Sequence, residues 1–134
     1  MRINTKIRYA LRMLLLLADN QEVINTSELG KKMLVSPKYL RKLAGPLERS
    51  NLIKSVQGIY GGYTLNKNPQ DISLHNLFDA YGEEIRLSDC ANGGKCVLFD
   101  ECIARPVWQN IEEKLITEFR SVTLSDILSN RSKK

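Results

Sequence analysis

The chain has 134 residues, a length that allows one apolar core with an appended element and excludes two full domains. It contains no run of about 20 apolar residues, and its first residues lack a signal-peptide pattern, so we expect a cytoplasmic protein with no membrane partner. The net charge of +5 is uneven, because residues 1–67 carry 12 basic and 4 acidic side chains, or +8, and residues 68–134 carry 8 and 11, or −3. The basic first half is expected to attract a phosphate backbone.

Three helices are predicted in the basic half. A core-packing helix over residues 4–18 is predicted from apolar residues at helical spacing, namely Ile7, Leu11, Leu14, Leu15 and Ala18. A short helix over residues 26–33 follows, with Thr26 as its expected cap. Ser36 and Pro37 then start a third helix that runs to about residue 50, since serine can cap the backbone and proline needs no N–H at the first helical position.

The second and third predicted helices are joined by about four residues, and the third leaves basic side chains on its outward face. This arrangement is typical of a helix-turn-helix, whose second helix enters the major groove of DNA, although any helical hairpin with a basic face would give the same pattern. Residues 52–56 and 63–65 predict two strands around a turn that contains Gly58, Gly61 and Gly62. Together these elements predict a winged helix-turn-helix, a mainly α fold with a small β-hairpin wing.

The second half of the chain predicts a helix over residues 73–81, which Ser73 can cap and Gly82 can end, and a short helix over residues 123–128. Between them, a long helix from Pro106 carries one apolar seam, formed by Trp108, Ile111, Leu115, Phe119 and Val122. Residues 112–114 beside the seam are charged and expected to be exposed, which favours packing of the seam against a second subunit. The alternative is that the seam packs back on its own head.

These elements divide the chain into three expected parts. Residues 1–67 form a DNA-binding domain, residues 68–104 a connecting helix with a cysteine loop, and residues 105–134 a dimerisation helix with a tail.

The three cysteines, Cys90, Cys96 and Cys102, are spaced six residues apart in a region that contains Gly93 and Gly94. Such a loop can turn three thiolates toward one point, and thiolates are the ligands that iron–sulfur clusters prefer. Zinc fits less well, because a zinc ribbon needs closer cysteine pairs and a fourth Cys or His. Taken alone, the three cysteines are as consistent with free thiols as with metal ligands, and a structural disulfide is not expected in the cytosol.

The whole chain resembles the Rrf2 family of winged-helix transcriptional regulators, which includes IscR-like and NsrR-like cluster sensors. Four features match the family pattern in order, namely the opening residues 1–10, the third-helix start at residues 36–43, the wing at residues 58–65 and the cysteine triplet. The resemblance implies a homodimeric repressor or activator whose last long helices cross at the dimer interface. It also implies a [2Fe–2S] or [4Fe–4S] cluster, which need not survive purification, between the three cysteines and a fourth ligand.

The chain departs from the family pattern at the expected fourth ligand. IscR-like members carry a cluster-binding histidine three residues after the last cysteine, where this chain has Arg105. NsrR-like relatives offer an aspartate where this chain has Arg8, which cannot ligate iron. The fourth ligand and the cluster type therefore stay open, with Asp89, Asp100, Glu101, the partner's first helix or a bound small molecule as candidates.

The expected DNA-reading residues also depart from the family. Arg41 stands where IscR-like proteins have a glutamate, and Gln57 where some relatives have an arginine, so we expect a different operator. Arg41 is the main candidate for base readout, because a guanidinium can pair bidentately with a guanine edge, while Gln57 and Tyr60 are candidates for the minor groove. The full set of predicted DNA-contacting residues is Arg2, Lys6, Ser36, Lys38, Tyr39, Arg41, Lys42, Lys54, Gln57 and Tyr60.

The sequence therefore predicts a transcriptional regulator whose cysteine loop has two arrangements, one ordered around a cluster and one released on its loss. Nitric oxide, oxygen and iron limitation all stay open as signals. The alternative is a cluster-independent regulator of the same fold, in which the cysteines act as redox thiols or another ligand is sensed. A cluster carrier or an enzyme is disfavoured, because the chain has a basic helix-turn-helix and lacks a P-loop, a dinucleotide fingerprint and paired catalytic carboxylates.

Overall fold

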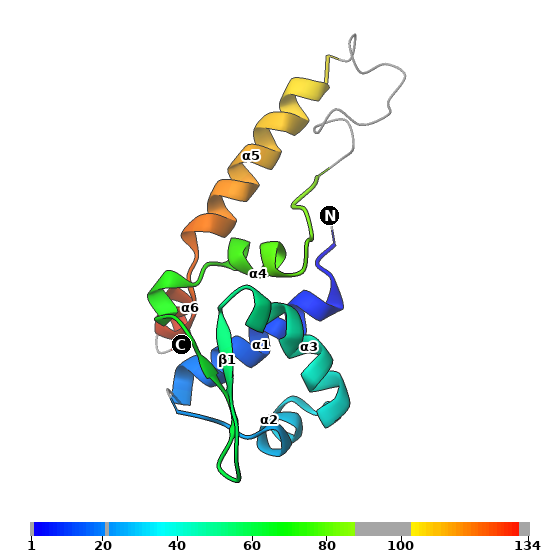
Figure 1. Ribbon diagram of the computed structural model, residues 1–134. Coiled ribbons are helices and arrows are strands. Elements are labelled where there is room, and N and C mark those ends of the chain that lie inside the picture. Colours follow the sequence, from blue (N-terminus) through cyan, green and yellow to red (C-terminus); the bar gives the residue numbers. More distant parts are fainter. Residues whose placement is uncertain (1, 21, 88–102, 132–134) are drawn as a thin grey trace.

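The computed structural model describes residues 2–20, 22–87 and 103–131 (Figure 1). The elements in chain order are α1 (Thr5–Asn20), α2 (Thr26–Met33), α3 (Pro37–Arg49), β1 (Ile53–Val56), β2 (Gly62–Leu65), the 3-10 helix η1 (Pro69–Asp71), α4 (Leu74–Ala80), α5 (Arg105–Ser121) and α6 (Leu124–Arg131). They confirm the predicted mainly α fold with a β-hairpin. Among the described residues, no helix is both long enough and apolar enough to cross a membrane.

Local capping groups set the starts of α2 and α3. The side chain of Asn25 caps α2 by accepting a backbone N–H at 2.7 Å, so the prediction of Thr26 as the cap was wrong by one residue. Both side chains carry an oxygen acceptor, and the extended backbone of Asn25 is what places it outside the helix. Ser36 caps α3 as predicted, accepting the N–H of Tyr39 at 3.1 Å, with Pro37 in the first helical position.

The core joins the apolar faces of α1, α2 and α3 to residues from β1, α4 and α6. On α1 the residues without exposed surface are Ala10, Met13, Leu14 and Leu17. Leu11 and Leu15, whose spacing also predicted core packing, pack against the core as half-buried side chains at its edge. Residues 13–17 are all apolar, so the spacing of apolar residues could not select the inner face of this helix.

The wing is held to the helix-turn-helix by a backbone bridge. β1 and β2 pair antiparallel, with Ile53 opposite Leu65. Ile24, which precedes α2, pairs with Tyr63 of β2 through hydrogen bonds of 3.0 and 2.9 Å between their backbone groups. A Cβ on Gly62 would lie 2.1 Å from the Ile24 carbonyl oxygen, so glycine is what allows this approach. No local sequence pattern predicted this pairing.

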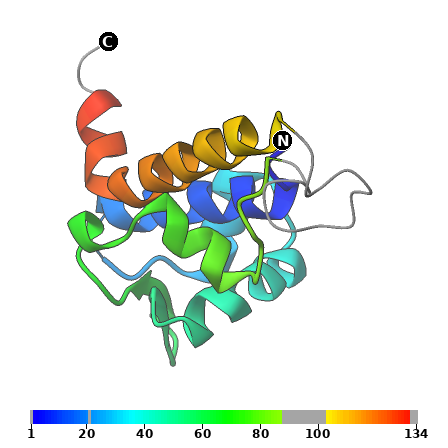
Figure 2. The ribbon, with the colours of Figure 1, turned by 90° about the horizontal axis from the view of Figure 1, so that it is seen from above.

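The second half of the chain packs on the head through α4 and α6. Ser73 caps α4 in a capping box with Asn76, and Gly82 follows the helix with a φ of +64°, as predicted. α5 packs on α4, where the rings of Phe78 and Phe119 lie 5.2 Å apart. The N-terminal half of α5 projects beyond the head (Figure 1), and α6 turns away from the axis of α5 to pack on α1 (Figure 2).

Candidate nucleic-acid interface

Four basic side chains lie on the solvent face of α3, three of them near its start and Arg49 at its end. Lys38, Arg41 and Lys42 are exposed, whereas Leu40 and Leu43 of the same helix are buried in the core. The leucines fix one face of the helix inward, and the cations are therefore held outward. The hydroxyl of Ser36, at the start of this helix, is used by the cap.

Arg41 lines a hollow of about 470 Å³ between α3, the start of α2 and the wing. Gln57 of the wing and Asn25 of the α2 cap line the same hollow. Burial raises the pKa of the Tyr63 hydroxyl, Glu48 adds to this shift, and the positive charge of Arg41 opposes it. The Arg41 guanidinium therefore lies close enough to Tyr63 of β2 to influence its hydroxyl. Arg41, the predicted base-reading residue, and Gln57, a predicted wing residue, line the same hollow.

A second hollow, of about 540 Å³, lies on the other side of α3 and is lined by the basic side chains Lys6, Arg41, Lys42 and Arg49. Lys6 lies 5.4 Å from the centre of the Tyr81 ring, a cation–π distance. The Tyr81 hydroxyl donates to the Leu43 carbonyl at 2.6 Å, and burial raises its pKa well above the usual range. Arg49 was not among the predicted contacts, although its outward position on the third helix could have indicated it.

Tyr39 is placed differently from the other predicted contacts. It is half-buried and packs against the core. Its ring meets that of Tyr9 edge-on, with centroids 5.9 Å apart and planes at 79°. Edge-to-face pairs of this kind stabilise aromatic packing, so the ring fastens α3 to α1.

The remaining predicted contacts are exposed. Lys54 lies on β1, and Gln57 and Tyr60 lie in the loop between the two strands. Arg2 precedes α1 and lines a separate hollow of about 920 Å³ with Arg8 and Glu83. The structure thus brings Arg41 and Gln57 together and Lys6 and Lys42 together, while Arg2 lies at another hollow.

The predicted cluster ligands Cys90, Cys96 and Cys102 lie outside the described residues, as do the three candidate carboxylates between residues 89 and 101. Within residues 2–20, 22–87 and 103–131, no group of three or more His, Cys, Asp or Glu side chains could hold a metal ion. Arg105 is the first residue of α5 and is half-buried. A guanidinium keeps its charge and offers donors without an acceptor, so it does not replace the histidine as a ligand.

Glu112 of α5 is buried, with 4% of its surface exposed, so the prediction that it is exposed was wrong. Its Oε1 accepts the backbone N–H of Leu87 at 2.7 Å. A buried carboxylate needs such hydrogen bonds, and this one fixes the chain at the last residue described before the cysteine segment. Glu112 lies four and seven residues before Ile116 and Phe119, which share its inner face, and this spacing could have revealed its burial.

The predicted dimer seam on α5 divides into two parts. Trp108 and Ile111, in the projecting half, are 41% and 42% exposed. Leu115 and Phe119 are half-buried against the chain's own core, and Val122 is half-buried after the end of the helix. The alternative of packing back on the head therefore applies to the second part of the seam.

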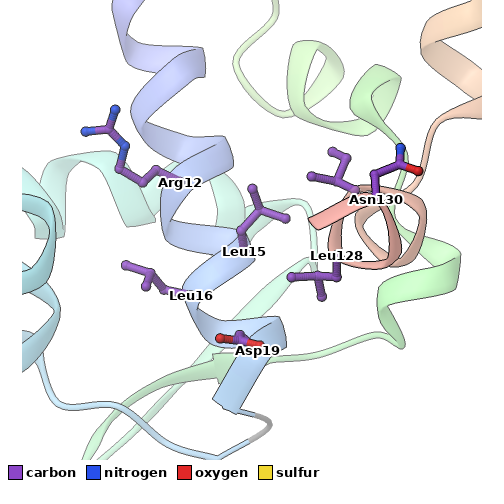
Figure 3. A pocket seen from close by; sticks show the side chains of 7 residues that line it. Arg12, Leu15, Leu16, Asp19, Leu128 and Asn130 are labelled. Atoms are coloured by element: carbon purple, nitrogen blue, oxygen red, sulfur yellow. The ribbon is translucent and has the colours of Figure 1, made fainter. Parts of the chain in front are cut away.

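An apolar groove of about 420 Å³ lies between α1 and α6. Figure 3 shows Leu15 of α1 on the side that faces Leu128 of α6, and Leu16 of α1 also lines the groove. Arg12, Asp19 and Asn130 also line the groove. Leu15 therefore packs at the edge of the core and also lines this groove.

Comparison with known proteins gives one family. The model of the Rrf2 family, described as an iron-dependent transcriptional regulator, matches residues 3–130. The regulator IscR of Klebsiella pneumoniae (strain 342) is 29% identical over 133 residues, covering 98% of this chain and 82% of the relative.

Solved structures agree with this result. The structure of CymR, the global cysteine regulator of B. subtilis, has a TM-score of 0.83 and 29% identity, covering 97% of this chain and 98% of CymR. IscR of T. potens has a TM-score of 0.76 and 25% identity, covering 98% of this chain and 88% of that one. The oxidized form of Staphylococcus aureus CymR has a TM-score of 0.73 and 28% identity, covering 95% of each chain.

Proposed function

The chain belongs to the Rrf2 family of transcriptional regulators, and from this premise we propose that it works as a homodimer whose operator binding is controlled by an iron–sulfur cluster. The family makes the chain a DNA-binding transcriptional regulator and not an enzyme. The dimer, the cluster, the contact residues and the cytoplasmic location are the proposed part. In this proposal residues 1–67 read DNA, residues 68–104 sense the signal and residues 105–134 hold the dimer.

The main support for the proposed DNA-binding surface is that Arg41 of α3 and Gln57 of the wing line the same hollow. With α3 in the major groove, the wing reaches the adjacent minor groove or its backbone. Arg41 is then positioned to read a guanine edge, and Lys38 lies beside it on the same exposed face.

Phosphate contacts come from the cations around this helix. Lys6 and Lys42 line the basic hollow beside α3, and Lys54 is exposed on β1. Cations of this kind add affinity without sequence preference and make binding depend on salt. Arg2, the Ser36 backbone region and the hydroxyl of Tyr39 complete the proposed set, while the ring of Tyr39 packs on that of Tyr9.

The exposed half of α5 supports the dimer. Val107, Trp108 and Ile111 leave an apolar face in solvent on the part of the helix that projects beyond the head. A second copy of the same helix can cover this face in an isologous contact. Two heads held in this way would read two half-sites of one operator.

Cys90, Cys96 and Cys102 are the residues that would hold the cluster, because three thiolates are a donor set for iron–sulfur centres. When bound, the cluster supplies a centre that nitric oxide, oxygen or iron limitation can alter. The three thiolates fit such a group, and Arg105 leaves the fourth ligand to another residue, the partner's first helix or a small molecule. The Glu112 carboxylate of α5 accepts the backbone N–H of Leu87 at 2.7 Å. Because Leu87 lies just before the cysteine segment, a rearrangement of that segment would be transmitted to α5 through this hydrogen bond.

A second candidate function is regulation through the thiols themselves. Two observations favour it, namely Arg105 in place of the histidine and the likeness to CymR, of which one structure is described as a global cysteine regulator and another as an oxidized form. In this case a cysteine thiol would be oxidised by a cellular oxidant or would bind a ligand directly. The DNA-binding surface would be the same.

Anaerobic purification followed by a visible absorption spectrum and iron and sulfide analysis separates the two candidates. The cluster proposal expects a coloured protein with stoichiometric iron and sulfide, both lost in Cys96→Ala. A colourless protein after anaerobic reconstitution would reject the cluster and favour the thiol regulator. Binding of promoter fragments with a steep salt dependence is expected in both cases, and its absence would reject the DNA-binding surface.

A further inference from the structure

The tip of the wing carries two large apolar side chains in solvent. Ile59 and Tyr60 are each 93% exposed, although such side chains gain free energy from burial. The N–H of Gly61 donates to the carbonyl of Gly58 at 3.0 Å, so residues 58–61 form a β-turn with Ile59 and Tyr60 at its centre. Such positions usually hold Gly, Pro, Asn, Asp or Ser, so these two side chains serve neither the turn nor the core.

The tip is also fixed in place relative to α3. A Cβ on Gly61 would lie 2.0 Å from the carbonyl oxygen of Val56, so the turn closes tightly on β1. The bridge between Ile24 and Tyr63 ties β2 to the start of α2. A tip held at both strands presents its side chains without a large entropy cost on binding.

The tip belongs to the surface that faces DNA. Ile59 lines the same hollow as Arg41 and Gln57. Residues 55–63 carry no charged side chain, so the tip itself offers no electrostatic attraction to phosphates. The minor groove is about 6 Å wide, its walls are sugar C–H groups, and proteins place apolar side chains there as wedges between base steps.

We infer that Ile59 and Tyr60 bind the minor groove next to the major groove that α3 occupies, as an apolar contact that reads groove shape. The inference rests on the DNA-binding function of the family and adds an uncharged, sequence-dependent contact to it. An apolar tip fits best over A·T pairs, because guanine places an amino group on the groove floor. It also favours pyrimidine–purine steps, which open easily.

The test uses the anaerobically purified full-length chain and duplexes that the wild type selects from a randomised pool. Affinity is measured by fluorescence anisotropy over a range of salt concentrations. The test variant combines Ile59→Ser with Tyr60→Ser, since serine suits an exposed turn and neither side chain supports the core. Ile59→Leu is the conservative control, and Lys54→Gln is the control that removes a cation.

For the double variant we expect a loss of affinity of about tenfold or more with an unchanged salt slope, because an apolar contact releases no counterions. Ile59→Leu should bind like the wild type, and Lys54→Gln should reduce the salt slope by about one. The inference would be overturned if the double variant bound DNA as tightly as the wild type. It would also be overturned if the loss of affinity came with a changed salt slope. If the wild type selects no duplex at all, the DNA-binding function itself fails.

Base analogues locate the contact. Replacing A·T pairs at the wing position by G·C should weaken binding by the wild type, and inosine·C should restore it, because inosine lacks the minor-groove amino group. The double variant should respond to neither change. Equal responses of the wild type to G·C and inosine·C would place the readout in the major groove and contradict the inference.

Discussion

The helix-turn-helix head buries its apolar side chains, whereas the projecting half of the long helix α5 leaves several of them exposed. Leu40 of α3 and Leu14 of α1 have no exposed surface, and each helix of the head turns its apolar face into a shared core. In the projecting half of α5, Val107, Trp108 and Ile111 stay in solvent. The head thus buries its apolar faces within a single chain, whereas this half of α5 is the part that we propose to pack against a second subunit.

The two regions also differ in the kind of contact that stabilises them. α3 is fastened to α1 by leucines and by the edge-on pair of Tyr9 and Tyr39. In the projecting half of α5, the buried side chain is Glu112, whose contact with Leu87 is a hydrogen bond. Hydrogen bonds depend on geometry more than apolar packing does, so this contact depends on the exact placement of Leu87 relative to α5.

The largest expected effect is in the head. Leu40→Ala should lower the free energy of unfolding by about 3 kcal/mol, because it removes a fully buried side chain and leaves a cavity. Urea denaturation at a protein concentration below the dimer dissociation constant measures the change, because Val107 lies on the proposed dimer face. Val107→Ala is the matched control on α5, and because Val107 is 53% exposed its cost should stay below about 1 kcal/mol. Equal costs for both variants would remove the contrast between the two regions.

The second effect concerns association. Trp108→Ser should raise the dimer dissociation constant about 30-fold while leaving the circular dichroism of the head unchanged, because aromatic residues dominate interfaces and this one adds little to the core. Sedimentation over a range of concentrations measures the constant. Lys114→Ser, an exposed site on the same helix, should leave it unchanged. A loss of helical signal in Trp108→Ser would show that the side chain serves the fold of the single chain.

These differences also explain which features the sequence could predict. Ser36 with Pro37, Ser73 and Gly82 were predicted correctly, because a cap depends on a few neighbouring residues. The bridge from Ile24 to Tyr63 was missed, since it joins residues far apart in the chain and leaves no local pattern.

Spacing also limits what can be predicted about the inner face of a helix. The apolar run in α1 fits more than one face, and Leu11 and Leu15 pack at the edge of the core. On α5 the charge of Glu112 suggested solvent, although its spacing to Phe119 put it on the inner face. The basic surface of α3 was predictable, because leucines at helical spacing determine which side chains point outward.

The third effect tests the polar contact of α5. Glu112→Ala should lower the free energy of unfolding by about 2 kcal/mol, because it removes a buried side chain and the N–H of the half-buried Leu87 loses its acceptor. Glu112→Gln keeps a carbonyl acceptor and should cost clearly less. Thermal and urea denaturation measure both variants. If the two variants lose the same stability, the negative charge matters more than the hydrogen bond to Leu87.

The smallest effect, and the one opposite in sign, lies in the turn between α2 and α3. Leu34 has a φ of 57° and a ψ of 43°, the left-handed region, and is 91% exposed. The N–H of Val35 donates to Gly30 and that of Leu34 to Lys31, the two hydrogen bonds of a Schellman motif, in which glycine is preferred at the left-handed position. The leucine therefore adds backbone strain without adding burial.

Leu34→Gly should raise the free energy of unfolding by roughly 0.5–1 kcal/mol, because relief of the left-handed strain exceeds the entropy that glycine gives the unfolded chain. Leu34→Ala keeps a Cβ in the same conformation and should gain nothing. A rise in Tm for glycine alone would show that the head tolerates local strain because its core supplies the stability. A loss of stability in Leu34→Gly would mean that the exposed leucine contacts something when the protein is folded, and the head would then share the dependence on a partner that we assign to α5.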